Sequence, residues 1–132
     1  MIQPAVFVAV AVGAAGGGML RYLLVIPFVT TAPAWPWATL LANALGSLVI
    51  GFVYGHAGLH RRLPVSWRVG IMTGFCGGLT TFSIFSLEVL LLWLDARAIA
   101  ALAYLVCSVV VWLAMVWAGF GLGSRLDPTA SR

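Results

Sequence analysis

The distribution of charged residues is the feature that most limits what this chain can fold into. Arg, Lys, Asp and Glu together supply only 8% of its 132 residues. They are absent from four long stretches, residues 1–20, 22–60, 69–87 and 98–124. A helix needs roughly 20 mostly apolar residues to cross a bilayer, and so few charges could not cover the surface of so apolar a soluble domain. The sequence therefore predicts an integral membrane protein.

The expected fold is all-α, a single integral membrane domain over residues 1–132 with four transmembrane helices. The spans are expected at about residues 5–26, 37–55, 67–94 and 98–122. The first lacks a basic region and a cleavage site, so it is expected to be a span and not a removable signal. The very short connection Asp95-Ala96-Arg97 predicts that the last two spans form an antiparallel hairpin.

The third span contains a stretch that disfavours a continuous helix. Gly74, Gly77 and Gly78 are followed closely by Thr80 and Thr81. Gly costs about 1 kcal/mol in a helix interior, and β-branched Thr adds a smaller cost. The span is also longer than one crossing requires. We therefore expect two half-helices separated by a break, which a membrane tolerates only where the freed backbone groups face protein or water.

A break of this kind exposes two sorts of ion-binding group. The carbonyls that end the first half-helix suit a hard cation such as Na⁺, and the N–H groups that begin the second suit an anion. Just beyond the break, Phe82 and Phe85 share a helix face. The edge of an aromatic ring carries partial positive charge and can help to solvate a small anion. The alternative is that the two rings simply pack in the core or against lipid.

Three polar side chains inside apolar spans allow two interpretations each. Asn43 is either an interhelical hydrogen-bonding residue or a donor to an ion in a pore. Arg21 either extends its guanidinium to the interface or supplies a cation at a pore mouth. Glu88 is a functional candidate because a carboxylate inside a membrane is costly, but its proximity to Asp95 also fits an interfacial position.

Other classes of function find little support. All seven basic residues are Arg and the net charge is +4, which in a membrane protein indicates orientation and headgroup contact and not nucleic acid binding. Cys76 and Cys107 both lie in expected spans, where they are interpreted as small apolar side chains. The sequence has no Ser/His/Asp or Cys/His arrangement and no group of metal ligands, so an enzyme is not expected.

Three motifs resemble those of the Fluc (CrcB) fluoride ion channel family of bacteria. They are Gly17-Gly18-Met19-Leu20-Arg21-Tyr22, Thr39-Leu40-Leu41-Ala42-Asn43-Ala44-Leu45-Gly46-Ser47 and Gly74-Phe75-Cys76-Gly77-Gly78-Leu79-Thr80-Thr81-Phe82-Ser83. The resemblance implies a passive, fluoride-selective channel in the bacterial inner membrane that exports cytoplasmic fluoride and gives fluoride resistance. It also implies an antiparallel, dual-topology homodimer with two pores at the subunit interface and a structural sodium ion at its centre.

The resemblance further implies roles for individual residues. The fluoride pore would be lined by Asn43, Phe82, Phe85, Tyr104 and Ser108. Backbone carbonyls of Gly77 and Thr80 would hold Na⁺, and Arg21 would lie toward an electropositive vestibule. Tyr104 and Ser108 would begin a polar track on the fourth span, and Trp112 would interrupt that track.

Two alternatives from other classes stay open. A small four-span antiporter for cationic drugs needs a carboxylate deep in a span, and Glu88 is its candidate. Transport that survives Glu88→Gln would exclude it. A non-transporting membrane scaffold would use its small-residue faces only for helix packing and would show no ion flux in liposomes. Neither alternative explains the break together with Asn43.

The arginines also bear on the expected assembly. Four spans place the termini and the 56–68 loop on one side, which carries Arg61, Arg62, Arg68, Arg125 and Arg132. The other side has Arg97 and Arg21. This excess predicts a single orientation in the membrane, whereas an antiparallel homodimer needs both.

Overall fold

The four charge-free stretches form four long helical segments. The computed structural model describes residues 4–29 and 35–127; residues 1–3, 30–34 and 128–132, which include Arg132, lie outside this description. Four segments are long and apolar enough to cross a membrane: Pro4–Phe28, Trp37–Gly55, Val65–Leu94 and Ala98–Arg125. The described part of the chain contains helices and connections but no strand. The prediction of an all-helical protein with four membrane-crossing segments is confirmed, and the chain is a multi-pass membrane protein.

The first two long helices differ from expectation only where they are joined. Helix α1 runs over Pro4–Val29 and includes Pro27, although a loop was expected to begin at that proline. A proline removes a single backbone hydrogen bond, and membrane helices tolerate this loss when neighbouring groups compensate. Residues 30–34 of the expected loop lie outside the described residues. Helix α2 occupies Trp37–Gly55, the range that the sequence predicted.

The expected polar loop at 56–68 is more regular than its composition indicated. It contains a short helix, α3, over Ala57–Arg62. The imidazole of His56 caps this helix, because its Nδ1 accepts a hydrogen bond from the backbone N–H of Leu59 at 3.3 Å. Helix α4 then begins the third span at Val65, two residues before the expected position.

The third span consists of two parts, and the junction between them lies later than the glycines suggested. Helix α4 (Val65–Val69) continues into a π-helical turn, η1 (Gly70–Phe75), and a short helix, α5 (Cys76–Leu79). Thr80 and Thr81 are extended, and α6 then runs over Phe82–Leu94. A break was expected along residues 74–81, but its glycines are helical. Only the threonines interrupt the helix, because Gly74 and Gly78 pack against α1.

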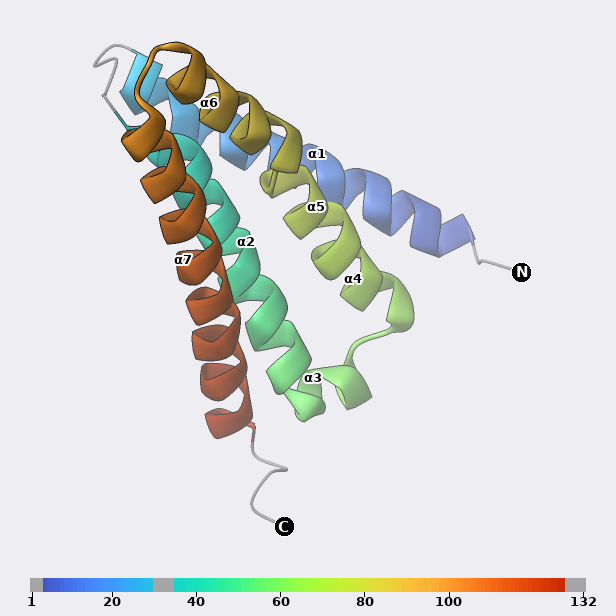
Figure 1. The fold of residues 1–132 in the computed structure, drawn as a ribbon. Helices are drawn as coiled ribbons and strands as arrows, with labels where there is room; N and C mark the ends of the chain where they lie inside the picture. Colours follow the sequence, from blue (N-terminus) through green and yellow to red (C-terminus); the bar gives the residue numbers. More distant parts are fainter. Residues whose placement is uncertain (1–3, 30–34, 128–132) are drawn as a thin grey trace.

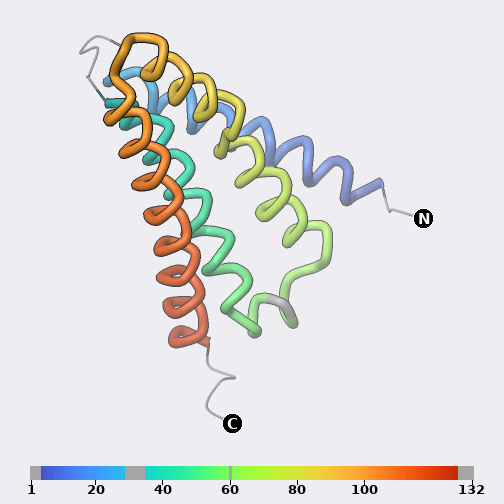
Figure 2. Tube along the Cα trace, viewed as in Figure 1, coloured from blue at the N-terminus to red at the C-terminus, as the bar shows by residue number. Residues whose placement is uncertain are grey.

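The break marks the point at which the third span changes partner (Figure 1). Before it, α4, η1 and α5 pack along α1. After it, α6 packs on α7, which covers Ala98–Arg125. Helix α2 packs closely along α7 and touches α1 much less. The trace in Figure 2 shows the result, two diverging pairs of helices that are joined at the end where α6 meets α7.

Glycines let the backbones approach closely within both pairs. A Cβ added at Gly13 or Gly17 of α1 would overlap the carbonyl of Gly70 or Phe75, and one added at Gly78 would overlap that of Ala14. The other pair has the same arrangement: a Cβ added at Gly51 of α2 would overlap the carbonyl of Val116, and one added at Gly119 of α7 would overlap that of Leu48. Small residues at four-residue spacing are typical of close helix pairs in membranes. The glycine spacing therefore builds the scaffold.

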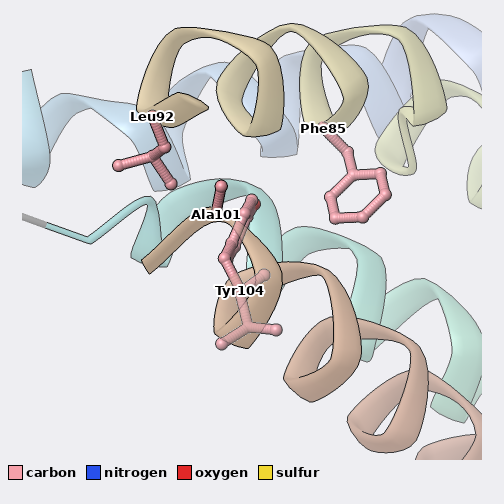
Figure 3. Close-up of a cluster of buried hydrophobic side chains, with 5 residues drawn as sticks. Phe85, Leu92, Ala101 and Tyr104 are labelled. Carbon is pink, nitrogen blue, oxygen red and sulfur yellow. The ribbon is translucent and has the colours of Figure 1, made fainter. Parts of the chain in front are cut away.

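A tight hairpin joins α6 to α7, as the short connection predicted. Ala96 adopts a positive φ of 58°, which lets the chain reverse between Asp95 and Arg97. The helices then enclose a small core of Leu40, Phe85, Leu92, Ala101 and Tyr104. Figure 3 shows Phe85 and Leu92 pointing from α6 toward the helix that carries Ala101 and Tyr104. Three helices thus meet immediately beyond the break.

Candidate functional site

A reciprocal pair of hydrogen bonds holds the break in place. The backbone N–H of Thr81 donates to Asn43 Oδ1 at 2.7 Å, and Asn43 Nδ2 donates to the Thr81 carbonyl at 3.0 Å. The Asn43 side chain is only 5% exposed. Because the N–H of Thr81 can only donate, the amide oxygen must face it, and this fixes the orientation of the side chain. Asn43 therefore satisfies backbone groups that the break removes from the helix.

The threonines complete the ends of the two half-helices. The N–H and Oγ1 of Thr80 both donate to the Cys76 carbonyl, at 2.8 and 2.9 Å. Thr81 Oγ1 caps α6 by accepting from the N–H of Ile84 at 3.3 Å. Since the Thr81 N–H is bound to Asn43, it does not cap the Gly77 carbonyl as it would in a continuous helix. A Cβ added at Gly77 would meet no atom within 4 Å, so this residue faces open space.

The two phenylalanines beyond the break are adjacent but differ sharply in exposure. Their ring centroids lie 5.7 Å apart. Phe85 is 4% exposed and belongs to the core, whereas Phe82 is 74% exposed. Within a single chain, the pair therefore leads from the outer surface at the break to the interior between α2, α6 and α7.

One face of α7 continues this arrangement with hydroxyl groups. Tyr104 and Ser108 are one helical turn apart, and both are fully buried. The Tyr104 ring lies 5.4 Å from that of Phe85. Ser108 Oγ makes no hydrogen bond to any described residue. Buried hydroxyls are normally hydrogen-bonded, so this one keeps a free hydrogen that a small ion in the interior could accept.

Glu88 joins the site through two short hydrogen bonds. Its carboxylate accepts from Thr39 Oγ1 at 2.6 Å and from the Tyr104 hydroxyl at 2.7 Å. Sequence reasoning left Glu88 open between a functional and an interfacial position, and it gave Thr39 no role. The spacing of four residues between Thr39 and Asn43 was the available signal, because it places both on one face of α2. The carboxylate is thus tied into the core beside the pore candidates.

A cavity brings the cation of α1 to the same region. It has a volume of about 330 Å³, and its lining includes Arg21, Thr39, Thr81 and Glu88. The arginine therefore shares a cavity with the break and with the carboxylate of α6. An opening that holds one guanidinium, one carboxylate and two threonines can attract and orient a small ion.

The described residues offer no metal site in addition to the break. They contain no group of three or more His, Cys, Asp and Glu side chains that could hold a metal ion. Cys76 is a buried free thiol and Cys107 an exposed one. The chemistry available at the break is therefore that of backbone carbonyls, N–H groups, hydroxyls and aromatic rings.

Comparison with known proteins agrees with this arrangement. The sequence model of the family described as "CrcB-like protein, Camphor Resistance (CrcB)" matches residues 8–120. A protein of Bradyrhizobium diazoefficiens named "Fluoride-specific ion channel FluC 1" is 45% identical over 120 residues, which cover 89% of this chain and 84% of that protein. A protein of the same name from Rhodopseudomonas palustris is 44% identical over 128 residues, covering 95% and 91% of the two chains.

A third relative is the "Fluoride-specific ion channel FluC" of Bordetella avium. It is 49% identical over 89 residues, which cover 67% of this chain and 69% of that protein. All three relatives are named as ion channels and none as an enzyme. The resemblance drawn from the three motifs is therefore confirmed, and the chain belongs to the CrcB family.

Proposed function

We propose that this protein is a passive, fluoride-selective ion channel of the bacterial inner membrane. Three relatives are named fluoride-specific ion channels, and the four apolar helices fit a multi-pass membrane protein. Fluoride enters a cell as neutral HF from acidic surroundings and is trapped inside as the anion. A passive channel is then sufficient to return fluoride to the exterior and so to give resistance.

The observation that carries the proposal is the pairing of Asn43 with Thr81 beside Phe82. An amide nitrogen has two hydrogens, and the bond to the Thr81 carbonyl uses one of them. The other can donate to an anion. The first N–H groups of α6 and the positive end of its dipole lie at the same place. A small, hard anion would thus find donors that are already held in position, with ring edges close by.

The proposed pore runs from the break into the core. Phe82 and Phe85 supply ring edges, Asn43 supplies an amide donor, and Ser108 supplies a hydroxyl further along. The Tyr104 ring would line the path beside Phe85, while its hydroxyl donates to Glu88. The unpaired hydroxyl of Ser108 supports this path most directly, because a passing anion would satisfy it. The cavity beside Arg21 would be the vestibule, with Glu88 in the same lining offsetting the charge of the guanidinium. Discrimination against chloride would come from the narrow geometry of these groups.

The exposure of Phe82 supports assembly of two chains. A pore-lining ring that is 74% exposed in one chain needs a second wall, and Ser83 and Ser86 are exposed on the same half-helix. We propose an antiparallel homodimer with two pores at its interface. The charge bias toward one side, with Arg61, Arg62 and Arg125 exposed there, opposes the dual topology that this requires. A monomeric mass in mild detergent at every concentration would rule the dimer out.

The break also fits a sodium ion by its chemistry. Hard cations prefer oxygen ligands, and the Gly77 carbonyl lacks the N–H that would cap it in a continuous helix. The open space beside Gly77 leaves room for a partner chain. Carbonyls of Gly77 and Thr80 from two chains would together supply four oxygens. Bound there, the ion would neutralise carbonyl dipoles and link the two chains.

The experiment that tests the channel is ion efflux from liposomes that contain the purified protein. Fluoride and chloride are measured separately, each with the wild type, Phe82→Ile and Phe85→Ile. We expect fast fluoride efflux without chloride efflux from the wild type. Both variants should lose most of the fluoride flux, because an aliphatic side chain fills the space without offering a positive ring edge.

The matched control is Phe7→Ile, because Phe7 is an exposed phenylalanine of α1 far along the chain from the break. It should leave the fluoride efflux unchanged. Unaltered flux in both Phe82→Ile and Phe85→Ile would remove the pore assignment. No flux of either ion from correctly folded wild-type dimers would instead favour the scaffold alternative.

A further inference from the structure

We propose that Trp112 is the residue that positions Phe85 in the pore and that ends the polar face of α7 at Ser108. The inference rests on the proposed fluoride pore and adds to it a residue on α7 whose side chain does not line the path. The face that carries hydroxyls at Tyr104 and Ser108 presents an indole, and not a third hydroxyl, one turn further on.

Two contacts fix the indole of Trp112. Its Nε1–H donates to the Leu40 carbonyl of α2 at 3.4 Å. Its ring lies edge-to-face with the ring of Phe85, with centroids 4.8 Å apart and planes at 71°. Within the described residues this is the shortest ring contact of Phe85, compared with 5.4 Å to Tyr104 and 5.7 Å to Phe82. The indole therefore links α2 to the buried ring of α6.

This arrangement holds Phe85 from two sides. Tyr104 and Trp112 stand two turns apart on α7, with Ser108 in the turn between them, and both rings contact Phe85. The Phe85 ring is therefore restrained next to the stretch of α7 that carries the unpaired Ser108 hydroxyl. Without the indole, a void would open beside Phe85 and its side chain could turn into other rotamers.

The contacts also explain why Trp112 acts through Phe85 and does not itself form part of the path. Its only polar group already donates to a backbone carbonyl. The indole has no acceptor and no second donor, so it cannot continue the sequence of hydroxyls. The donors of α7 therefore end at Ser108, and an anion that has reached this residue must leave the helix face there.

The test compares Trp112→Leu, Trp112→Phe and Trp117→Leu in the same liposome assay, with fluoride and chloride efflux measured for each. Trp117 lies on the same helix but is 73% exposed, so its replacement removes an equal side chain away from the cluster. We expect Trp112→Leu to reduce the rate of fluoride efflux about tenfold and to lower the ratio of fluoride efflux to chloride efflux. The free energy of one aromatic pair corresponds to a change in rate of about this size. Trp112→Phe should restore most of both, and Trp117→Leu should match the wild type.

The outcomes separate this inference from the proposed function. A wild-type protein without fluoride efflux would overturn both the proposed channel function and the role of Trp112. A conducting wild type with Trp112→Leu equal to Trp117→Leu would overturn the role of Trp112 alone. Loss of flux in Trp112→Phe as complete as in Trp112→Leu would also overturn it, because the ring would then not be the active element. A structure of Trp112→Leu should show Phe85 in a changed rotamer with the helices unmoved; an unchanged Phe85 would refute the proposal independently of transport.

Discussion

The two halves of the third span differ in how they are held. Before the break, η1 and α5 contact α1 through glycines and backbone carbonyls, with almost no side chain between the helices. After the break, α6 contacts its neighbours through long side chains: Phe85 and Leu92 in the core and Glu88 in hydrogen bonds to Thr39 and Tyr104. One half is a scaffold that depends on the absence of side chains, and the other is a site that depends on their identity.

The difference shows why the break lies between these halves. A glycine-packed helix lies too close to its partner to present side chains to an ion, and a helix with large side chains cannot come so close. The chain changes from one mode to the other within Thr80 and Thr81, and Asn43 satisfies the backbone there. The position of the site follows from this change of packing.

The largest effect should come from disturbing the glycine-packed half. A Cβ at Gly78 would overlap the Ala14 carbonyl, and backbone atoms cannot move aside cheaply. We expect Gly78→Ala to cost about 3 kcal/mol and to lower both the yield of folded protein and its unfolding temperature. The measurement is thermal unfolding in detergent. Gly121→Ala is the control, because a Cβ there meets nothing within 4 Å and should be neutral or stabilise by up to about 1 kcal/mol. Equal stability of the two variants would contradict the close packing.

A smaller but specific effect is expected at the junction. Asn43→Ala leaves the N–H and carbonyl of Thr81 without partners, at a cost of about 1–3 kcal/mol for each buried group. The variant should fold less stably and should lose most fluoride efflux. Ser47→Ala removes a polar group one turn further along α2 and should change neither unfolding temperature nor flux. An Asn43→Ala protein with wild-type stability would show that the break does not depend on this pair.

The smallest effect concerns the proposed cation between the halves. Replacing Na⁺ by a large organic cation should lower the unfolding temperature of the protein by a few degrees. A ligand at 100 times its Kd contributes about 2.7 kcal/mol, and much of this energy would be lost. Replacing chloride by another anion at constant Na⁺ should have no effect. A melting curve that is indifferent to Na⁺ at all concentrations would speak against a cation on the Gly77 and Thr80 carbonyls.

Much of the fold could be predicted from the sequence because a membrane imposes simple rules. The four stretches without charged residues predicted the four spans, because a charged side chain inside a bilayer is costly. Three residues between spans gave the hairpin of α6 and α7. The interruption of the third span was also predictable, but its extent was not. Gly74, Gly77 and Gly78 were interpreted as helix breakers, whereas close packing on α1 keeps Gly74 and Gly78 helical.

The polar connections of the site were harder to foresee. Asn43 and the two phenylalanines stood out because an amide and paired rings are uncommon next to a broken helix. Glu88 is hydrogen-bonded to Thr39, 49 positions away, and to Tyr104, 16 positions away, so the link joins three helices. The spacing of Thr39 and Asn43 places Thr39 on the face of the site, but it does not indicate which residue Thr39 contacts, because the helices could pair in several ways. Tertiary packing alone selects among them.

The first helix pairs with the third span and the second with the fourth, and this alternation has a consequence for synthesis. Helix α1 must wait for residues 65–79 before its partner exists, and α2 must wait for residues 98–125. Neither pair can close on the ribosome until the intervening segments have entered the membrane, and the last pair forms only with the final helix. A nascent chain therefore carries the unpaired glycine face of α2 in lipid until residues 98–125 have been made. Chains truncated before α7 should accordingly be substrates for membrane quality control.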